Sequence, residues 1–170
     1  MTAANRVRSR PSRVLVVSIS ILSIGAACSV GAPSTFTLRS ASVDTTTYWC
    51  PLGATNAAYK LYATIDAYNG SSGMVTIKSV GAVLTLAAIK GSWLQHVGDK
   101  YEAGDVTFTP AGVGAGSQAN LTVTVSSACT NGKQASDSPS LADYSIALTV
   151  RTSSGTYSVT TQNRHRIVAG

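Results

Sequence analysis

Apolar and polar side chains alternate over residues 59–67, and this pattern constrains the fold more than any other feature of the sequence. A period of two is the spacing of a β-strand with one buried face. Short segments of similar character recur along the chain, with runs rich in Gly, Ser and Asn between them. Such spacing predicts an all-β protein, an antiparallel β-sandwich. The strand-like segments are residues 59–67, 74–78, 105–110, 121–125, 144–152 and 156–161.

Two pairs of these segments are expected to form β-hairpins. The turn sequence Asn-Gly-Ser-Ser-Gly separates residues 59–67 from residues 74–78, and Ser-Ser-Gly separates residues 144–152 from residues 156–161. Short links that contain Gly favour pairing of the two flanking strands. Residues 82–94 fit neither the strand period nor the helix period cleanly. We favour strands there, with a short helix as the alternative.

The sequence GDVTFTPAGVGAGSQANLTVTVSS, residues 104–127, resembles a strand–turn–strand pattern of immunoglobulin-like domains in bacterial surface proteins. The resemblance implies an immunoglobulin-like sandwich. The chain departs from true immunoglobulin domains in two respects. Trp49 precedes Cys50 instead of following it, and Ser127 occupies the position two residues before Cys129 where those domains carry a tyrosine.

The N-terminal part of the chain has the organisation of an export signal. Four arginines precede residues 14–27, which carry no charge and end in small residues. A basic start, a short apolar stretch and a small-residue exit define a secretory signal, and this stretch is shorter than the roughly 20 residues of a membrane-spanning helix. We therefore expect residues 1–27 to be an export signal peptide, residues 28–34 a flexible tether, and residues 35–170 a single β-sandwich domain.

The net charge of the exported part argues against a nucleic-acid partner. The whole chain carries 13 basic and 7 acidic residues, but four of the basic residues and none of the acidic ones precede Cys28. The remainder has a net charge of +2, and no segment of it clusters Lys and Arg. Binding of nucleic acid normally needs such a basic cluster, so we expect none.

Three cysteines, Cys28, Cys50 and Cys129, leave one without a partner in an exported protein. The stretch from Ile24 to Cys28 resembles the lipobox of bacterial lipoproteins, although Gly25 stands where that family usually has Leu. The resemblance implies a lipid attached to Cys28 and a protein anchored to the membrane of the cell envelope. In the alternative, ordinary cleavage discards Cys28 and the protein is freely secreted. Either way, the even pair Cys50 and Cys129 predicts one disulfide.

Candidate functional residues concentrate in residues 91–105 and around Cys50. Aromatic side chains combine a large contact area with a polar group, so Trp93 with Tyr101, or Tyr48 with Trp49, are candidates for ligand binding. Three carboxylates within seven residues are candidate calcium ligands, because Ca²⁺ prefers oxygen donors. These are Asp99, Glu102 and Asp105.

The motifs of the common hydrolases, metalloproteases and phosphate-binding enzymes are missing from the sequence. His96 and His165 are its two histidines, and we expect both at the surface. These observations favour a non-enzymatic binding or adhesion module that needs no cofactor and contacts an envelope protein or a glycan. A structural subunit of a surface layer or filament is the alternative. A small extracellular hydrolase that uses a histidine with a carboxylate is the third hypothesis.

Overall fold

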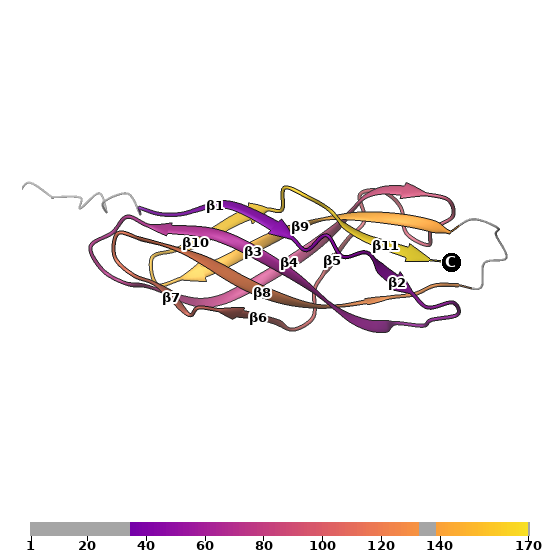
Figure 1. Ribbon diagram of the computed structural model, residues 1–170, viewed down its shortest axis with the longest axis horizontal. Coiled ribbons are helices and arrows are strands. Elements are labelled where there is room, and N and C mark those ends of the chain that lie inside the picture. The colour runs from indigo at the N-terminus through magenta and orange to yellow at the C-terminus, as the bar shows by residue number, and fades with distance from the viewer. Residues whose placement is uncertain (1–34, 133–138, 170) are drawn as a thin grey trace, which may run out of the picture. The chain divides into compact units, whose positions relative to one another are not determined.

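A computed structural model describes residues 35–132 and 139–169, which form two β-sheets around one hydrophobic core (Figure 1). The described residues contain no helix, and hence none that could span a membrane. The strands are β1 (Phe36–Val43), β2 (Tyr48–Cys50), β3 (Ala57–Asn69), β4 (Val75–Lys90), β5 (Lys100–Glu102), β6 (Val106–Thr109), β7 (Gly112–Val113), β8 (Ser117–Cys129), β9 (Ser140–Thr152), β10 (Thr156–Thr160) and β11 (His165–Ala169).

The order of the strands is that of an immunoglobulin-like sandwich. One sheet has the order β1-β3-β8-β6, which corresponds to the A-B-E-D sheet of immunoglobulin domains. The other has the order β2-β11-β9-β4-β5, in which β4, β9 and β11 occupy the positions of strands C, F and G. The predicted β-sandwich is therefore confirmed by the topology of the chain itself.

One pair of strands departs from the antiparallel pattern. β2 runs parallel to β11, with Tyr48 opposite Ile167 and Cys50 opposite Ala169. The pairs formed by the remaining strands are antiparallel, including β10 with β9 and β11 with β9. The first strand, β1, belongs to the four-stranded sheet, and β2, which follows it, belongs to the other sheet. This segment therefore connects the two sheets at their edges.

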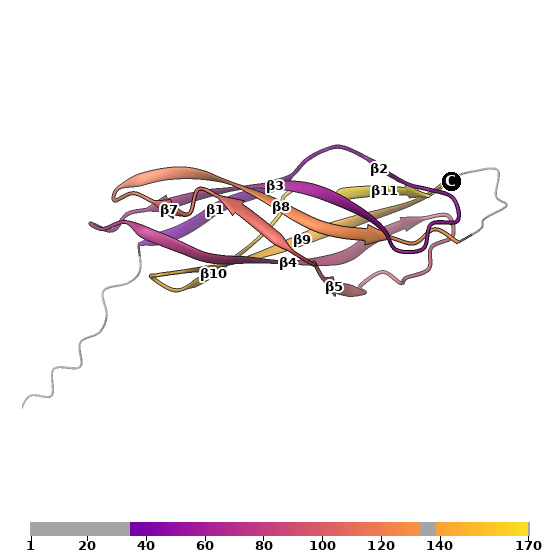
Figure 2. The same cartoon turned by 90° about the horizontal axis from the view of Figure 1, so that it is seen from below.

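The first expected hairpin is wrong in its pairing, although both of its strands form. β3 lies in the four-stranded sheet and β4 in the other sheet, so the turn at residues 69–73 crosses between the layers (Figure 2). Asn69 is buried at this crossing, and its side-chain amide donates to the carbonyls of Gly73 (2.8 Å) and Val113 (2.9 Å). These bonds hold the turn against β7 instead of closing a two-stranded ribbon.

The second expected hairpin is confirmed, because β9 and β10 pair antiparallel, with Arg151 opposite Thr156. The strand that we favoured for residues 82–94 is confirmed as far as Lys90, where β4 ends, and a loop follows. Alternation here is obscured because β4 shifts register between Leu86 and Ala88. A bulge of this kind places two successive residues against one partner and breaks the period of two.

The predicted disulfide joins Cys50 to Cys129 across 79 residues of sequence. Cys50 ends β2 in one sheet, and Cys129 ends β8 in the other, so the bridge links the two layers. In immunoglobulin domains the second cysteine lies on strand F, whereas β8 occupies the position of strand E. Immunoglobulin domains carry a tyrosine two residues before the strand-F cysteine. Because Cys129 lies on a strand at position E, a tyrosine is not expected at Ser127.

Candidate functional site

Two adjoining depressions lie beside β5, where the chain crosses from one sheet to the other. Their volumes are about 430 and 340 Å³, and we refer to them together as the β5 groove. Both are lined by Asn56, Tyr101 and Ala128. The larger depression also contacts Gln95, Asp99 and Thr130, and the smaller one Ser126 and Ser127.

The groove is open because the strands that pair with β8 and β4 beside it, β6 and β5, are short. β6 pairs with β8 only as far as Val125, and β5 is three residues long. The crossing segment between them is held by Ser126, whose carbonyl accepts from the N–H of Gly104 (3.2 Å) and whose N–H donates to the carbonyl of Asp105 (3.0 Å). Beyond Ser126, no described strand pairs with β8 on this side. The end of β8 and the strand β5 therefore form the two walls of the groove.

Behind the groove, inside the sandwich, lies a cluster of hydroxyl groups from Tyr59, Tyr101 and Ser127. Tyr59 lies directly opposite Ser127 in the pairing of β3 with β8 and is only 8% exposed. The Tyr59 and Ser127 hydroxyls are closed to solvent, and they lie close to each other and to the Tyr101 hydroxyl. Burial raises the pKa of Tyr59 to about 12, and it also raises the pKa of Tyr101. These hydroxyls are therefore neutral at any physiological pH.

Aromatic rings surround this cluster inside the sandwich. Tyr48 stacks on Tyr59 with ring centroids 4.0 Å apart, and Tyr59 stacks on His165 at 5.5 Å. The ring of Tyr101 meets that of Tyr144 nearly edge-on, at 5.8 Å and 74°. Tyrosines at such positions contribute packing through the ring and bonding through the hydroxyl. The interior beside the groove is thus aromatic and polar.

The aromatic residues predicted as ligand contacts occupy different environments. Tyr48, Trp93 and Tyr101 are half-buried and pack against the core, whereas Trp49 is 63% exposed. Trp93 and Tyr101 come together through their shared neighbour Tyr144. Of the four, Tyr101 lines the β5 groove.

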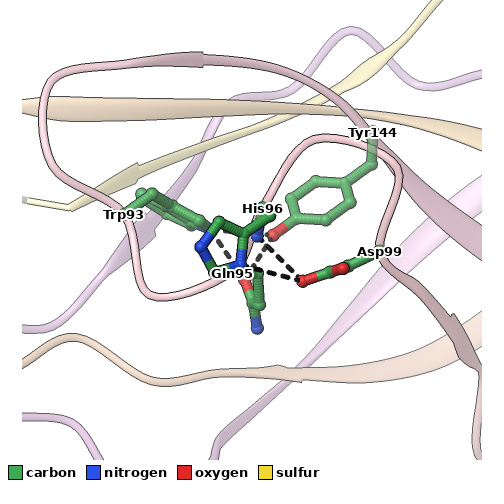
Figure 3. A network of polar contacts seen from close by, with 5 residues as sticks. All are labelled: Trp93, Gln95, His96, Asp99 and Tyr144. Carbon is green, nitrogen blue, oxygen red and sulfur yellow. Dashed lines mark hydrogen bonds and ion pairs between the residues drawn. The ribbon is translucent and has the colours of Figure 1, made fainter.

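A network of hydrogen bonds anchors the loop after β4 beside the groove (Figure 3). The indole N–H of Trp93 donates to Gln95 Oε1 (2.7 Å) and to the Tyr144 hydroxyl (3.1 Å), and this hydroxyl in turn donates to Gln95 Oε1 (3.1 Å). The backbone N–H of His96 donates to Asp99 Oδ2 (2.8 Å). The loop is therefore fixed to β9 by side chains and holds Gln95 at the rim of the groove.

The candidate calcium ligands Asp99, Glu102 and Asp105 are exposed. Among residues 35–132 and 139–169, no group of three or more His, Cys, Asp or Glu side chains is arranged to hold a metal ion. Asp99 instead uses its carboxylate to accept from the backbone of His96. The calcium hypothesis thus has no counterpart in the described geometry.

The two histidines differ, and the expectation that both lie at the surface is wrong for His165. His165 is 2% exposed, and neither of its ring nitrogens has a hydrogen-bond partner within the protein. Burial lowers the pKa of His165, and the nearby carboxylate of Asp44 opposes this effect. The His96 side chain is 92% exposed, with Nδ1 3.8 Å from Asp99 Oδ2. Neither histidine lines the β5 groove.

The groove residues Asn56 and Ser127, and Tyr59 in the core behind them, were not identified from the sequence as parts of a site. Tyr59 belonged to the buried face of an alternating strand, so the pattern placed it in the core but gave no sign that its hydroxyl meets those of Ser127 and Tyr101. Asn56 has a φ of 56°, a left-handed conformation that Asn adopts more readily than most residues. The Thr-Asn pair at this turn was a weak local signal for that conformation.

No protein-family model matches the chain, and no curated protein matches it. Among solved structures it is similar to the ASH / PapD-like domain of human CEP192 (PapD-like domain 7). The sequence identity is 10%, the match covers 94% of this chain and 96% of that one, and the TM-score is 0.23. A TM-score this low supports no conclusion about this chain. The immunoglobulin-like fold is assigned from the strand order described above, and the function is proposed from the geometry of the β5 groove.

Proposed function

We propose that this protein is an exported, non-enzymatic β-sandwich that binds an envelope protein or a glycan through the β5 groove. The observation that supports this most directly is the groove itself, two adjoining depressions of about 430 and 340 Å³ that share Asn56, Tyr101 and Ala128 in their lining. Ligand sites are typically concave, and they combine an apolar or aromatic lining with a few polar groups, as this groove does.

A binding role also fits the surroundings of the groove better than catalysis does. A hydrolase of the kind considered above would need a histidine beside the substrate, with a carboxylate to orient it. His96 is on an exposed loop and His165 is inside the sandwich, and the groove is lined by neither. Besides the charged side chains of Asp99, Lys100 and Glu102, its polar groups are amides and hydroxyls, which recognise and orient a ligand without activating a nucleophile.

Binding can be tested with the chain from residue 28 onward, carrying Cys28→Ser so that no lipid is attached. Ala128 lines both depressions, so Ala128→Arg should fill the groove. Thr122→Arg, at an exposed position of the same strand, is the matched control. Sedimentation with isolated envelopes of the native host should retain the parent and the control but lose Ala128→Arg. Equal sedimentation of all three, or of none, would contradict the proposal.

We further propose that Cys28 carries a lipid that anchors the protein to the membrane. The lipobox-like sequence supports this, and both Cys28 and the predicted signal peptide lie outside the residues that the structure describes. Mass spectrometry of the N-terminal peptide from the native host should find an acylated Cys28. An unmodified N-terminus beyond Cys28 would establish free secretion instead.

The alternative of a filament subunit would require a free strand edge for pairing between copies. The outer edge of β1 is partly closed within the chain. Gln162 donates its N–H to the Ala41 carbonyl (2.8 Å), and the Asn163 side chain bonds to both backbone groups of Val43, at 2.8 and 2.6 Å. This edge therefore does not favour the alternative.

A further inference from the structure

We infer that His165 makes one edge of the sandwich an acid-sensitive latch, which is closed at neutral pH and opens when the imidazole ring is protonated. The latch consists of residues 44–50, which run from the end of β1 through β2, and residues 165–169, which form β11. Its opening also loosens the packing behind the β5 groove, and this second part of the inference rests on the proposed binding function.

The His165 ring is enclosed by segments from both sheets. It lies opposite Tyr144 in the pairing of β11 with β9, and it stacks on Tyr59 of β3 with ring centroids 5.5 Å apart. Tyr59 also stacks on Tyr48 of β2, at 4.0 Å. His165 is 2% exposed, and neither of its ring nitrogens has a hydrogen-bond partner among the described residues. A protonated ring would therefore carry a second N–H donor with no acceptor in reach.

The titratable and charged side chains around the ring leave a positive charge largely uncompensated. They are Asp44, Tyr48, Tyr59 and Tyr144 from the segments packed together here, then the exposed Arg164 and the Arg166–Asp143 ion pair. Burial raises the pKa of Tyr59 and of Tyr144 to about 12, so both hydroxyls are neutral. Asp44 attracts an imidazolium, but burial outweighs this attraction and lowers the pKa of His165. Protonation therefore favours an open latch, in which water solvates the ring.

The latch is also the part of the sandwich with the shortest pairing between strands that cover the core here. β2 forms three parallel pairs with β11 at the end of their sheet (Figure 1), and β11 forms five pairs with β9. Residues 44–47 belong to no strand. By contrast, β3 and β8 are 13 residues long and pair along their whole length. A charge at His165 is therefore relieved by local opening of this edge, while the sheets stay together.

The disulfide limits how far the latch can open. Cys50 ends β2 and is bonded to Cys129 at the end of β8, so residues 44–50 stay attached to the other sheet when their pairing with β11 is lost. At the other end of the segment, the Asp44 N–H donates to the Tyr62 carbonyl (2.8 Å). Opening between two such attachments is local, so the latch should close again when the pH is raised.

Tyr59 connects the latch to the β5 groove. Its ring stacks on His165, and its hydroxyl lies close to those of Ser127 and Tyr101, both of which line the groove. When the latch opens, Tyr59 loses ring contacts from Tyr48 and His165, and the groove residues lose a fixed neighbour behind them. We therefore expect binding in the groove to weaken as the pH falls below about 6.5, the ordinary pKa of a solvated histidine.

The test is hydrogen exchange of the Cys28→Ser chain from residue 28, followed by mass spectrometry at pH 7.5 and 5.5. Rates are corrected for the intrinsic pH dependence of amide exchange. Peptides from residues 44–50 and 165–169 should open up to about tenfold more often at pH 5.5, because each pH unit below about 6.5 changes the opening constant by at most tenfold. Peptides from residues 61–67, within β3, should show no change.

Two variants assign the effect to His165. His165→Phe keeps a ring against Tyr59 but takes up no proton, so it should remove the difference between the two pH values, and His165→Asn serves the same purpose if the larger ring prevents folding. His96→Asn, which removes the exposed histidine, should retain the difference. Equal exchange of the parent latch at both pH values would overturn the inference, and so would a difference that persists in the folded His165 variants.

Sedimentation with isolated envelopes tests the coupling to the groove. Parent and His165→Phe should both be retained at pH 7.5, and at pH 5.5 the parent should be lost while His165→Phe is retained. Equal retention of the parent at both pH values would overturn the coupling. Absence of retention at either pH would contradict the proposed binding function, whereas the exchange experiment decides on the latch independently of any ligand.

Discussion

The two halves of the sandwich interior are built from different kinds of residues. Towards the turn at residues 69–73, β3 and β8 face each other through fully buried aliphatic side chains such as Ile65 and Leu121. Towards the disulfide, the same two strands present Tyr59 and Ser127, within the aromatic cluster. The aliphatic half stabilises the fold by burying apolar surface. The aromatic half instead buries the hydroxyls of Tyr59 and Ser127 and the ring nitrogens of His165, and removing such polar atoms from water costs free energy.

The largest effect should come from the disulfide, which closes the aromatic half of the interior. Replacing both cysteines, as Cys50→Ala with Cys129→Ala, should reduce the free energy of unfolding by about 4–5 kcal/mol, because the bridge closes a loop of 79 residues in the unfolded chain. Urea denaturation of the oxidised parent and the double variant measures the difference. A loss below about 1 kcal/mol would mean that this half holds together without its covalent link.

Leu121→Ala should produce the next largest loss, in the aliphatic half. Leu121 is completely buried, and truncation of such a leucine costs about 2–5 kcal/mol through lost burial and the cavity left behind. Urea denaturation should place its midpoint well below that of Thr122→Ala, the exposed neighbour, which should stay within about 0.5 kcal/mol of the parent. Similar losses for Leu121→Ala and Ser127→Ala would break the contrast between the two halves.

The pH dependence of stability should come chiefly from His165 in the aromatic half. Burial lowers its pKa in the folded protein, so below the unfolded value of about 6.5 the unfolded chain binds the proton more readily. Stability should therefore fall as the pH drops from about 7 through 6, by at most about 1.4 kcal/mol per pH unit. Urea denaturation at several pH values should lose this slope in His165→Asn and retain it in His96→Asn. An unchanged slope in His165→Asn would contradict the assignment.

Tyr144→Phe should have the smallest effect on stability. The variant removes the hydroxyl that bonds to Trp93 and Gln95 and keeps the buried ring. Because the Trp93 N–H still donates to Gln95 Oε1 at 2.7 Å, no polar group is stranded, and the loss should be about 0.5–1.5 kcal/mol. Thermal unfolding measures it, and a loss above about 3 kcal/mol would show that the network supports the whole aromatic half.

Much of the fold could be predicted from local patterns. Residues 59–67 and 121–125 were placed in strands because their alternation has a period of two, and both lie within the strands β3 and β8. Pairing was harder to predict. The turn after β3 has the composition of a hairpin, yet Asn69 binds β7 and directs the chain into the other sheet.

The site was less accessible from sequence than the fold. Tyr101 was identified because it is an aromatic in a polar segment, but Tyr59 and Ser127 are 68 positions apart in the chain and meet only through the pairing of β3 with β8. His165 lies in a short basic segment and was expected at the surface. Its burial results from pairing with β9 and stacking on Tyr59, contacts with residues far away in the sequence.

The sequence by itself determined the β character of this protein and the cysteine pair that links its sheets. Strand alternation depends on neighbouring residues, and cysteine parity depends on composition, so both can be read without knowing the fold. Tertiary structure alone decided which sheet each strand joins and which hydroxyls converge at the β5 groove. These choices depend on packing between strands far apart in the sequence, where a favourable contact must first offset the entropy of closing the chain.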